Sequence, residues 1–116
     1  MNVEHIQQQL RVFAQERDWE QFHTPKNLAS ALAVEASELL EIFQWLTEAQ
    51  SIAITDDERQ LRKVEEEMAD VTMYLFRLAD VLGLDLQAAV DRKLRINAEK
   101  YPVEKAHGNA KKYTEL

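Results

Sequence analysis

The sequence predicts an all-α protein of the four-helix-bundle type, for two reasons. The chain has 116 residues but only two Gly and two Pro, whereas a β-rich fold needs many more turn residues. Its apolar residues also recur every three or four positions in four long segments, which is the period of an amphipathic helix. A chain of this length forms about one domain, so we expect residues 1–116 to make a single domain.

The first helix is expected from Val3 to Arg17, with Asn2 as its N-terminal cap. A break follows over residues 18–24. Thr24-Pro25 then provides a cap and a first-turn proline for a second helix, which extends to about Thr47. The apolar stripes that we expect these two helices to bury are Val3, Ile6, Leu10 and Phe13, and Leu28, Leu32, Leu39, Ile42, Phe43 and Leu46.

Residues 48–55 carry no strong period and are expected to be irregular. A third helix follows, and glycine at position 83 is a common way to end it. Thr55, Asp56 or Asp57 can cap its start. Its apolar stripe consists of Leu61, Val64, Met68, Val71, Leu75, Leu78 and Leu82.

The fourth helix is expected to start after Asp85, which can cap it, and to continue to Tyr101. Pro102 closes this helix, because proline cannot donate the backbone hydrogen bond that would extend it. Residues 103–116 are expected to form an irregular tail.

Charge and cysteine content exclude several classes of function. The net charge of −7 argues against binding a nucleic-acid polymer, since basic surfaces bind phosphate backbones, but it does not exclude a single nucleotide. The absence of cysteine removes disulfides and thiolate ligands, which argues against zinc. The N-terminal residues lack the pattern of a secretory signal and no apolar run could span a membrane, so we expect a cytoplasmic protein without a membrane partner.

Two acidic pairs lie within the apolar segments of the second and third predicted helices: Glu35 with Glu38, and Glu67 with Asp70. Residues three apart project from one helix face, so two such helices packed together can direct four carboxylates to one point. Carboxylates in apolar surroundings are costly unless a cation binds them, and oxygen ligands suit Mg²⁺. One pair alone is usually solvated surface charge. Two pairs predict a metal site.

Helical projection distinguishes the acids from one another. At about 100° per residue, Glu35 falls near the centre of its helix's apolar stripe and cannot simply face water. Glu38, Glu67 and Asp70 lie on the shoulders of the stripes. The acids that turn further outward, to which we assign no function, are Glu41, Glu65 and Glu66.

The ExxE and ExxD pairs, separated by 28 residues, resemble those of the all-α nucleoside triphosphate pyrophosphohydrolases related to MazG. Further sequence blocks resemble the dCTP pyrophosphatase branch of that family, and together they span nearly the whole chain. They are RDWEQFHTPKNLA (Arg17–Ala29), ELLEIFQW (Glu38–Trp45), EEMADVTMYL (Glu66–Leu75), KLRINAEKYP (Lys93–Pro102) and KYTEL (Lys112–Leu116).

The resemblance implies that Glu35, Glu38, Glu67 and Asp70 hold Mg²⁺, which positions or activates the attacking water. The implied reaction hydrolyses a dNTP between its α and β phosphates to dNMP and pyrophosphate. The branch prefers dCTP or a modified dCTP and cleanses the nucleotide pool. This chemistry needs hard oxygen ligands and no protein nucleophile.

The resemblance also implies a base pocket in which aromatic faces sandwich the base and polar groups read its edge. The residues that it assigns to this pocket are Trp19, His23, Trp45, Tyr74 and Asn97. Taken singly, the two tryptophans are more often core or interface residues, and a loop histidine more often forms a local hydrogen bond.

Basic residues near the end of the chain could approach a phosphate or the sugar. Lys93 recurs at helical spacing with Asn97 and Lys100, and Lys111 and Lys112 lie in the tail. Lysines on a charged face usually bind nothing specific. Branch members often have Arg at position 111, and a lysine binds phosphate as a point charge and not as a fork, which leaves the role of Lys111 open.

The second and third helices are apolar over a wider arc than one chain can cover, so we expect self-association. The resemblance implies a homotetramer built as a pair of dimers, with sites near the subunit interfaces. Two other functions stay open: a dNTP pyrophosphohydrolase of broad specificity, and a non-enzymatic helical interaction module whose acids bind a partner's basic surface.

Overall fold

The computed structural model describes residues 1–116, and all of its regular structure is helical, which confirms the all-α class. Its elements are α1 (Val3–Glu16), η1 (Glu20–Phe22), α2 (Pro25–Phe43), α3 (Glu48–Ile52), η2 (Ala53–Asp56), α4 (Glu58–Val81), α5 (Leu86–Lys100), α6 (Val103–Ala106) and η3 (Tyr113–Glu115), where η denotes a 3-10 helix. The chain divides into two compact units, Met1–Gly83 and Leu84–Leu116. The four-helix bundle and the single domain stay predictions.

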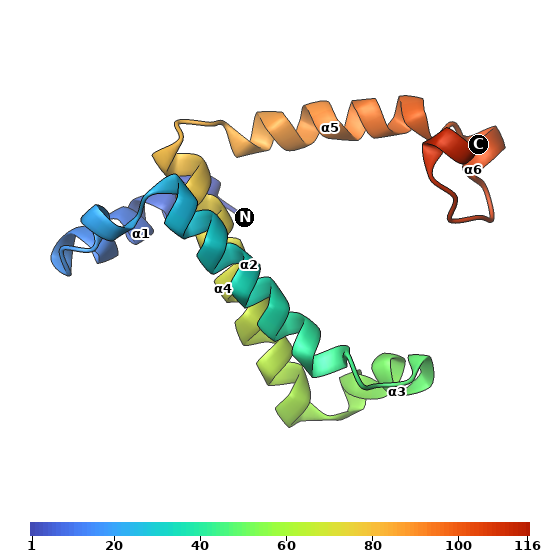
Figure 1. Cartoon of the computed structure of the whole chain (residues 1–116), viewed down its shortest axis with the longest axis horizontal. Helices are drawn as coiled ribbons and strands as arrows, with labels where there is room; N and C mark the ends of the chain where they lie inside the picture. The colour runs from blue at the N-terminus through green and yellow to red at the C-terminus, as the bar shows by residue number, and fades with distance from the viewer. The chain divides into compact units, whose positions relative to one another are not determined.

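The first unit is built on α2 and α4, which run antiparallel and side by side, while α1 packs against α4 (Figure 1). Its buried apolar side chains are Ala14 from α1, Leu28 from α2, and Phe76 and Ala79 from α4. The buried side-chain amide of Gln7 donates a hydrogen bond to the carbonyl oxygen of Phe76 at 3.0 Å. The core therefore lies beside the start of α2 and the end of α4, where α1 packs on α4.

Helix starts follow the predicted caps. Side-chain oxygens of Asn2, Thr24, Asp57 and Asp85 accept hydrogen bonds from the first-turn N–H groups of α1, α2, α4 and α5. After α4, Gly83 has a φ of 67°, a left-handed conformation that glycine adopts without steric cost. Local chemistry thus sets where each long helix begins.

The predicted end of the second helix is wrong, because α2 stops at Phe43 and not near Thr47. Thr47 begins a new helix: its N–H donates to Gln50 Oε1 at 2.9 Å, and the Gln50 N–H donates to Thr47 Oγ1 at 3.1 Å. This capping box starts α3 in the segment that we expected to be irregular. The α3 segment is too short to show a helical period in the sequence. Because α2 ends at Phe43, Trp45 does not belong to α2.

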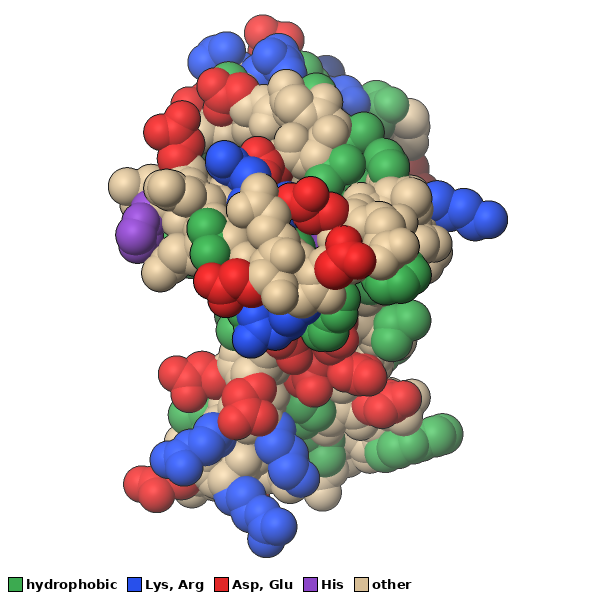
Figure 2. Space-filling model, turned by 90° about the vertical axis from the view of Figure 1, so that its left-hand side faces the viewer, with side chains coloured by type: hydrophobic (Ala, Val, Ile, Leu, Met, Phe, Trp, Pro, Cys, Tyr) green, Lys and Arg blue, Asp and Glu red, His purple; other side chains and the backbone are tan.

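The apolar stripe predicted for the third helix is only partly buried within one chain. Four of its members, spaced seven residues apart, stay between 37% and 55% exposed: Leu61, Met68, Leu75 and Leu82. The buried residues of α4 are Phe76, Arg77 and Ala79. Figure 2 shows hydrophobic side chains open on the surface among charged ones. A second apolar face of α4 therefore stays uncovered.

The second unit contains α5, α6 and η3, so the expectation of a wholly irregular tail is wrong. The ring of Tyr113 lies edge-on to that of Tyr101, with centroids 6.1 Å apart. The Lys100 Nζ lies 4.6 Å from the centre of the Tyr113 ring, a cation–π geometry. These contacts tie the end of the chain to the end of α5. None of the helices has the length and apolarity that a membrane span requires.

Candidate functional site

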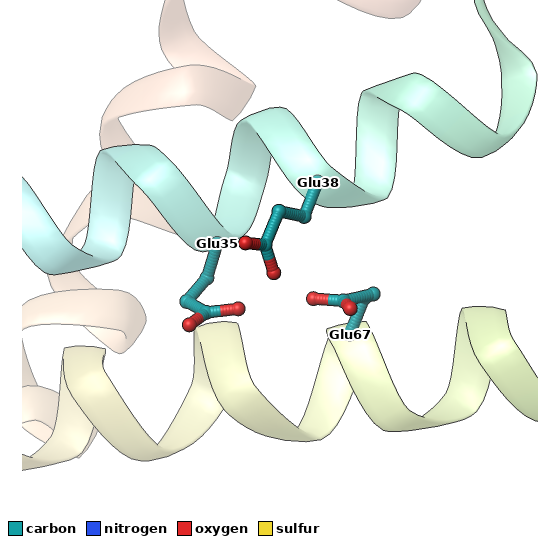
Figure 3. A group of neighbouring side chains, drawn as sticks. All are labelled: Glu35, Glu38 and Glu67. Carbon is teal, nitrogen blue, oxygen red and sulfur yellow. The ribbon is translucent and has the colours of Figure 1, made fainter.

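Three glutamates meet between α2 and α4. Glu35 and Glu38 project from α2 toward Glu67 of α4 (Figure 3), and one carboxylate oxygen of each lies within 4.8 Å of the others. The Oε2 atoms of Glu35 and Glu67 are buried and have no hydrogen-bond partner. A buried carboxylate oxygen without a partner costs free energy that a bound cation would offset. These hard oxygen donors fit a divalent cation such as Mg²⁺.

The pKa values of two of the clustered carboxyl groups also favour a bound cation. Burial, followed by the adjacent carboxyl groups of Glu38 and Glu67, raises the pKa of Glu35 to about 7. Burial is also the largest cause that raises the pKa of Glu67. Like charges this close together disfavour joint ionisation. The cluster therefore takes up a proton near neutral pH unless a cation compensates the charge.

An open groove of about 560 Å³ gives access to the cluster from one side. Glu38 and Glu67 line it together with Glu41, Ile42, Gln60, Lys63 and Glu66. Glu41 and Glu66 thus border the groove without joining the three clustered carboxylates, and Lys63 places one positive charge in an otherwise acidic wall.

A second hollow lies next to the cluster along α4. Asp70 follows Glu67 by three residues and lines a cavity of about 230 Å³ without joining the three clustered glutamates. Its charge still contributes to the raised pKa values of Glu35 and Glu67. The other lining residues are Leu10, Phe13, Trp19, His23, Met73, Tyr74 and Arg77. Apolar and aromatic walls with a few polar groups are typical of small-molecule sites.

Trp19 reaches this cavity because α1 ends in a Schellman motif. The N–H of Trp19 donates to the carbonyl of Ala14 at 2.8 Å, and the N–H of Asp18 donates to the carbonyl of Gln15 at 3.1 Å. Asp18 has a φ of 54°, a left-handed conformation that aspartate visits more readily than most residues. The Trp19 ring packs edge-on against Phe13, with centroids 5.8 Å apart. The indole is thus held by backbone and ring contacts together.

His23 lies directly before the Thr24 cap of α2. Its Nδ1 accepts a hydrogen bond from Arg77 Nε at 3.2 Å. Burial, and secondly the Arg77 charge, lower the pKa of His23 below its ordinary value of 6.5. Arg77 was absent from the sequence-based site, although it follows Tyr74 by three residues and Asp70 by seven and so shares their face of α4. That spacing was the signal that could have identified it.

The structure thus brings Glu35, Glu38 and Glu67 together, and separately gathers Asp70 and the three predicted base-pocket residues Trp19, His23 and Tyr74 around one cavity. It does not bring Trp45 to either place, since Trp45 is 86% exposed in the turn after α2 and lines neither hollow. The remaining predicted residues are exposed in the second unit: Lys93 and Asn97 on α5, and Lys111 and Lys112 before η3.

The chain is similar in sequence to proteins from mammals. It is 45% identical over 104 residues to dCTP pyrophosphatase 1 of Homo sapiens and 44% identical to the protein of the same name in Rattus norvegicus, in each case over 90% of this chain. These matches cover 61% of each relative, so the chain spans about three fifths of their length.

A solved structure agrees with this fold. The crystal structure of a pyrophosphatase from Archaeoglobus fulgidus DSM 4304 superposes with a TM-score of 0.79 at 42% identity, covering 85% of this chain and 91% of that one. Residues 31–116, which include both acidic pairs, match the model of the MazG-like family. The chain belongs to the MazG-like family, and within it resembles the dCTP pyrophosphatases.

Proposed function

We propose that this protein is a Mg²⁺-dependent pyrophosphohydrolase that converts a dNTP, with dCTP or a modified dCTP preferred, into dNMP and pyrophosphate. The observation that carries the proposal is the pair of buried, unpartnered carboxylate oxygens of Glu35 and Glu67 in a three-glutamate cluster. The class of reaction, release of pyrophosphate, is taken from the names of the relatives, which are pyrophosphatases. House-cleaning of the nucleotide pool in the cytoplasm is the role that follows.

Glu35, Glu38 and Glu67 would hold the cation, and Asp70 is proposed as a fourth ligand because its charge already acts on two of them. Bound there, Mg²⁺ would supply Lewis-acid charge to the triphosphate and lower the pKa of a water molecule. The chain's own contribution is to hold four carboxylates on two packed helices. This preorganisation avoids the cost of assembling the ligands during the reaction.

The cavity beside Asp70 is proposed to hold the base. At about 230 Å³ it is smaller than the roughly 300–1,000 Å³ typical of sites for whole drug-sized ligands, so it suits a ring system and not a complete nucleotide. Trp19 and Tyr74 offer aromatic faces, each worth about 1–3 kcal/mol in stacking on a base. His23 offers a polar edge. A base held there would place its triphosphate toward the neighbouring carboxylates.

Four polar residues of the second unit are also proposed as substrate-binding residues. Lys93 and Asn97 lie four residues apart on α5 and therefore share one face of that helix. Lys111 and Lys112 precede Tyr113, which is held against α5. Their ammonium groups suit a triphosphate as point charges, and the Asn97 amide suits a sugar or base edge.

A homotetramer arranged as a pair of dimers is proposed as the working assembly. Exposed apolar residues at positions 61, 68 and 75 of α4 and at its C-cap, position 82, repeat every seven residues, which is the spacing of a helix–helix seam. Trp45, at 86% exposure, is an additional large apolar surface for a second copy to cover. Trp45 then serves the base site of a neighbouring subunit.

A pyrophosphate-release assay tests the proposal. The four common dNTPs and 5-substituted dCTP are compared at equal concentration, with Mg²⁺ and with EDTA. We expect turnover that requires Mg²⁺ and favours the cytosine nucleotides, and a Glu38→Gln variant at least about 100-fold slower, because even residues that only support a metal ligand cost 10- to 100-fold. A flat profile would replace the dCTP preference by broad specificity. Absence of hydrolysis with every dNTP would support the non-enzymatic helical module instead.

A further inference from the structure

Arg77 is a buried cation on the wall of the proposed base cavity, with only 7% of its surface exposed. Its Nε donates to His23 Nδ1 at 3.2 Å. A guanidinium has donors only and cannot accept a hydrogen bond, so the nitrogen that it contacts must carry a lone pair. The ring proton of a neutral His23 therefore lies on Nε2.

A second contact holds Arg77 in place. Its Nη1 lies 3.5 Å from Asp80 Oδ2, and the same oxygen accepts a hydrogen bond from Arg11 Nε at 2.7 Å. Burying a charge is costly unless a partner compensates it, and Asp80 supplies that partner. The series Arg11, Asp80, Arg77 and His23 runs from α1 across α4 to the residue before the Thr24 cap of α2. These contacts hold the Arg77 guanidinium in place, with its Nε–H directed at His23 Nδ1.

We infer that Arg77 is a positioning residue that locks His23 in the neutral tautomer with hydrogen on Nε2, so that the cavity offers one N–H donor to a carbonyl acceptor on its ligand. With Nδ1 occupied by Arg77, Nε2 is the only ring nitrogen left for a ligand. The lowered pKa of His23 agrees with a ring that stays neutral. On a pyrimidine the matching acceptor is the C2 carbonyl oxygen. This identification of the ligand rests on the proposed function, whereas the tautomer does not.

The tautomer is tested by NMR on the full chain labelled with ¹⁵N-histidine, about one pH unit above the ordinary histidine pKa of about 6.5. The chain has only three histidines, and the exposed His5 and His107 serve as internal references. Long-range ¹H–¹⁵N correlations should show His23 with an unprotonated Nδ1 and a protonated Nε2. Protonation of Nδ1 in the wild-type protein would overturn the inference without any variant.

Arg77→Met removes the donor and keeps the aliphatic stem. We expect it to abolish the single-tautomer pattern of His23 while the signals of the other two histidines stay unchanged. Arg62→Met, an exposed arginine on the same helix, is the matched control and should change nothing. An unchanged His23 pattern in folded Arg77→Met would refute the positioning role. Asp80→Asn provides a second variant, because it loosens Arg77 without deleting it.

Steady-state kinetics then test whether the His23 tautomer contributes to substrate binding. Loss of one hydrogen bond to the base should raise the KM for dCTP about tenfold in Arg77→Met while kcat changes less than about twofold, because the reacting phosphates lie elsewhere. A tenfold lower kcat with an unchanged KM would contradict a role of Arg77 in base binding. If the wild-type protein hydrolyses no dNTP, the proposed function fails, and the NMR result still decides the role of Arg77.

Discussion

Glu35 on α2 and Glu67 on α4 each bury one carboxylate oxygen that has no hydrogen-bond partner, and both lie against the carboxylate of Glu38. Folding alone gains nothing from this arrangement, since like charges in a buried position repel and lose hydration. The cost persists in the metal-free protein, and a bound cation would offset it. The stability of the metal-free protein and the proposed metal-dependent function therefore place opposite demands on this site.

Glu35→Gln should stabilise the metal-free protein but reduce the stabilisation that Mg²⁺ provides. In EDTA we expect the variant to melt about 4 °C or more above the wild type, because one buried like charge is gone, and about 1 kcal/mol shifts the Tm of a small domain by 4–8 °C. In Mg²⁺ it should lose most of the metal-induced rise in Tm. Differential scanning fluorimetry measures both. Glu65→Gln, an exposed acid on α4, is the control and should follow the wild type. A variant that melts lower in EDTA and keeps the full Mg²⁺ response would show that the cluster binds no cation.

Metal-free protein should become less stable as the pH rises from about 4.5 to about 7. The pKa of Glu35 rises from 4.5 to about 7 on folding, chiefly because of burial, so over this range the folded state binds more protons than the unfolded state. Stability then falls with increasing pH and levels off above the folded pKa. Melting temperatures in EDTA across this range measure the slope. The slope should be shallower in Glu35→Gln; identical slopes in the two proteins would contradict the raised pKa.

Asp70→Asn decides whether Asp70 is a metal ligand or part of the base cavity. We expect it to weaken the Mg²⁺-induced rise in Tm, as the glutamate variants do, because its charge acts on Glu35 and Glu67. A Mg²⁺ titration followed by melting temperature measures the effect. Should the titration stay unchanged while the KM for dCTP rises, Asp70 would belong to the cavity that it lines and not to the metal site.

The exposed apolar face predicts that the chain is not a monomer in solution. Size-exclusion chromatography with light scattering should give the mass of four 13.5 kDa chains. Replacing Met68 and Leu75, two of the four apolar residues that repeat every seven positions, by lysine should reduce that mass, because a buried charge without a partner disrupts an apolar interface. Lysine at Val103, which is exposed outside the seam, is the control. A wild-type mass of one chain would refute the proposed tetramer.

Much of this architecture follows from local sequence chemistry. The starts of α1, α2, α4 and α5 were predicted from caps whose side chains do accept the expected hydrogen bonds. Helical spacing also selected three glutamates that prove to be neighbours. The prediction was wrong at the end of α2, since the short capping box at Thr47 carries too little periodicity to compete with a long apolar pattern.

The sequence by itself determined the helical class, the helix starts and the acidic residues that share a face, because these depend on neighbours within a turn or two of the chain. The tertiary structure decided the rest. Only the packing of α2 on α4 shows that Glu67 buries an oxygen against Glu35, and only the approach of α1 and α4 links Arg11, Asp80 and Arg77 to His23. Contacts between residues more than thirty positions apart depend on how the helices pack, and no local spacing encodes that packing.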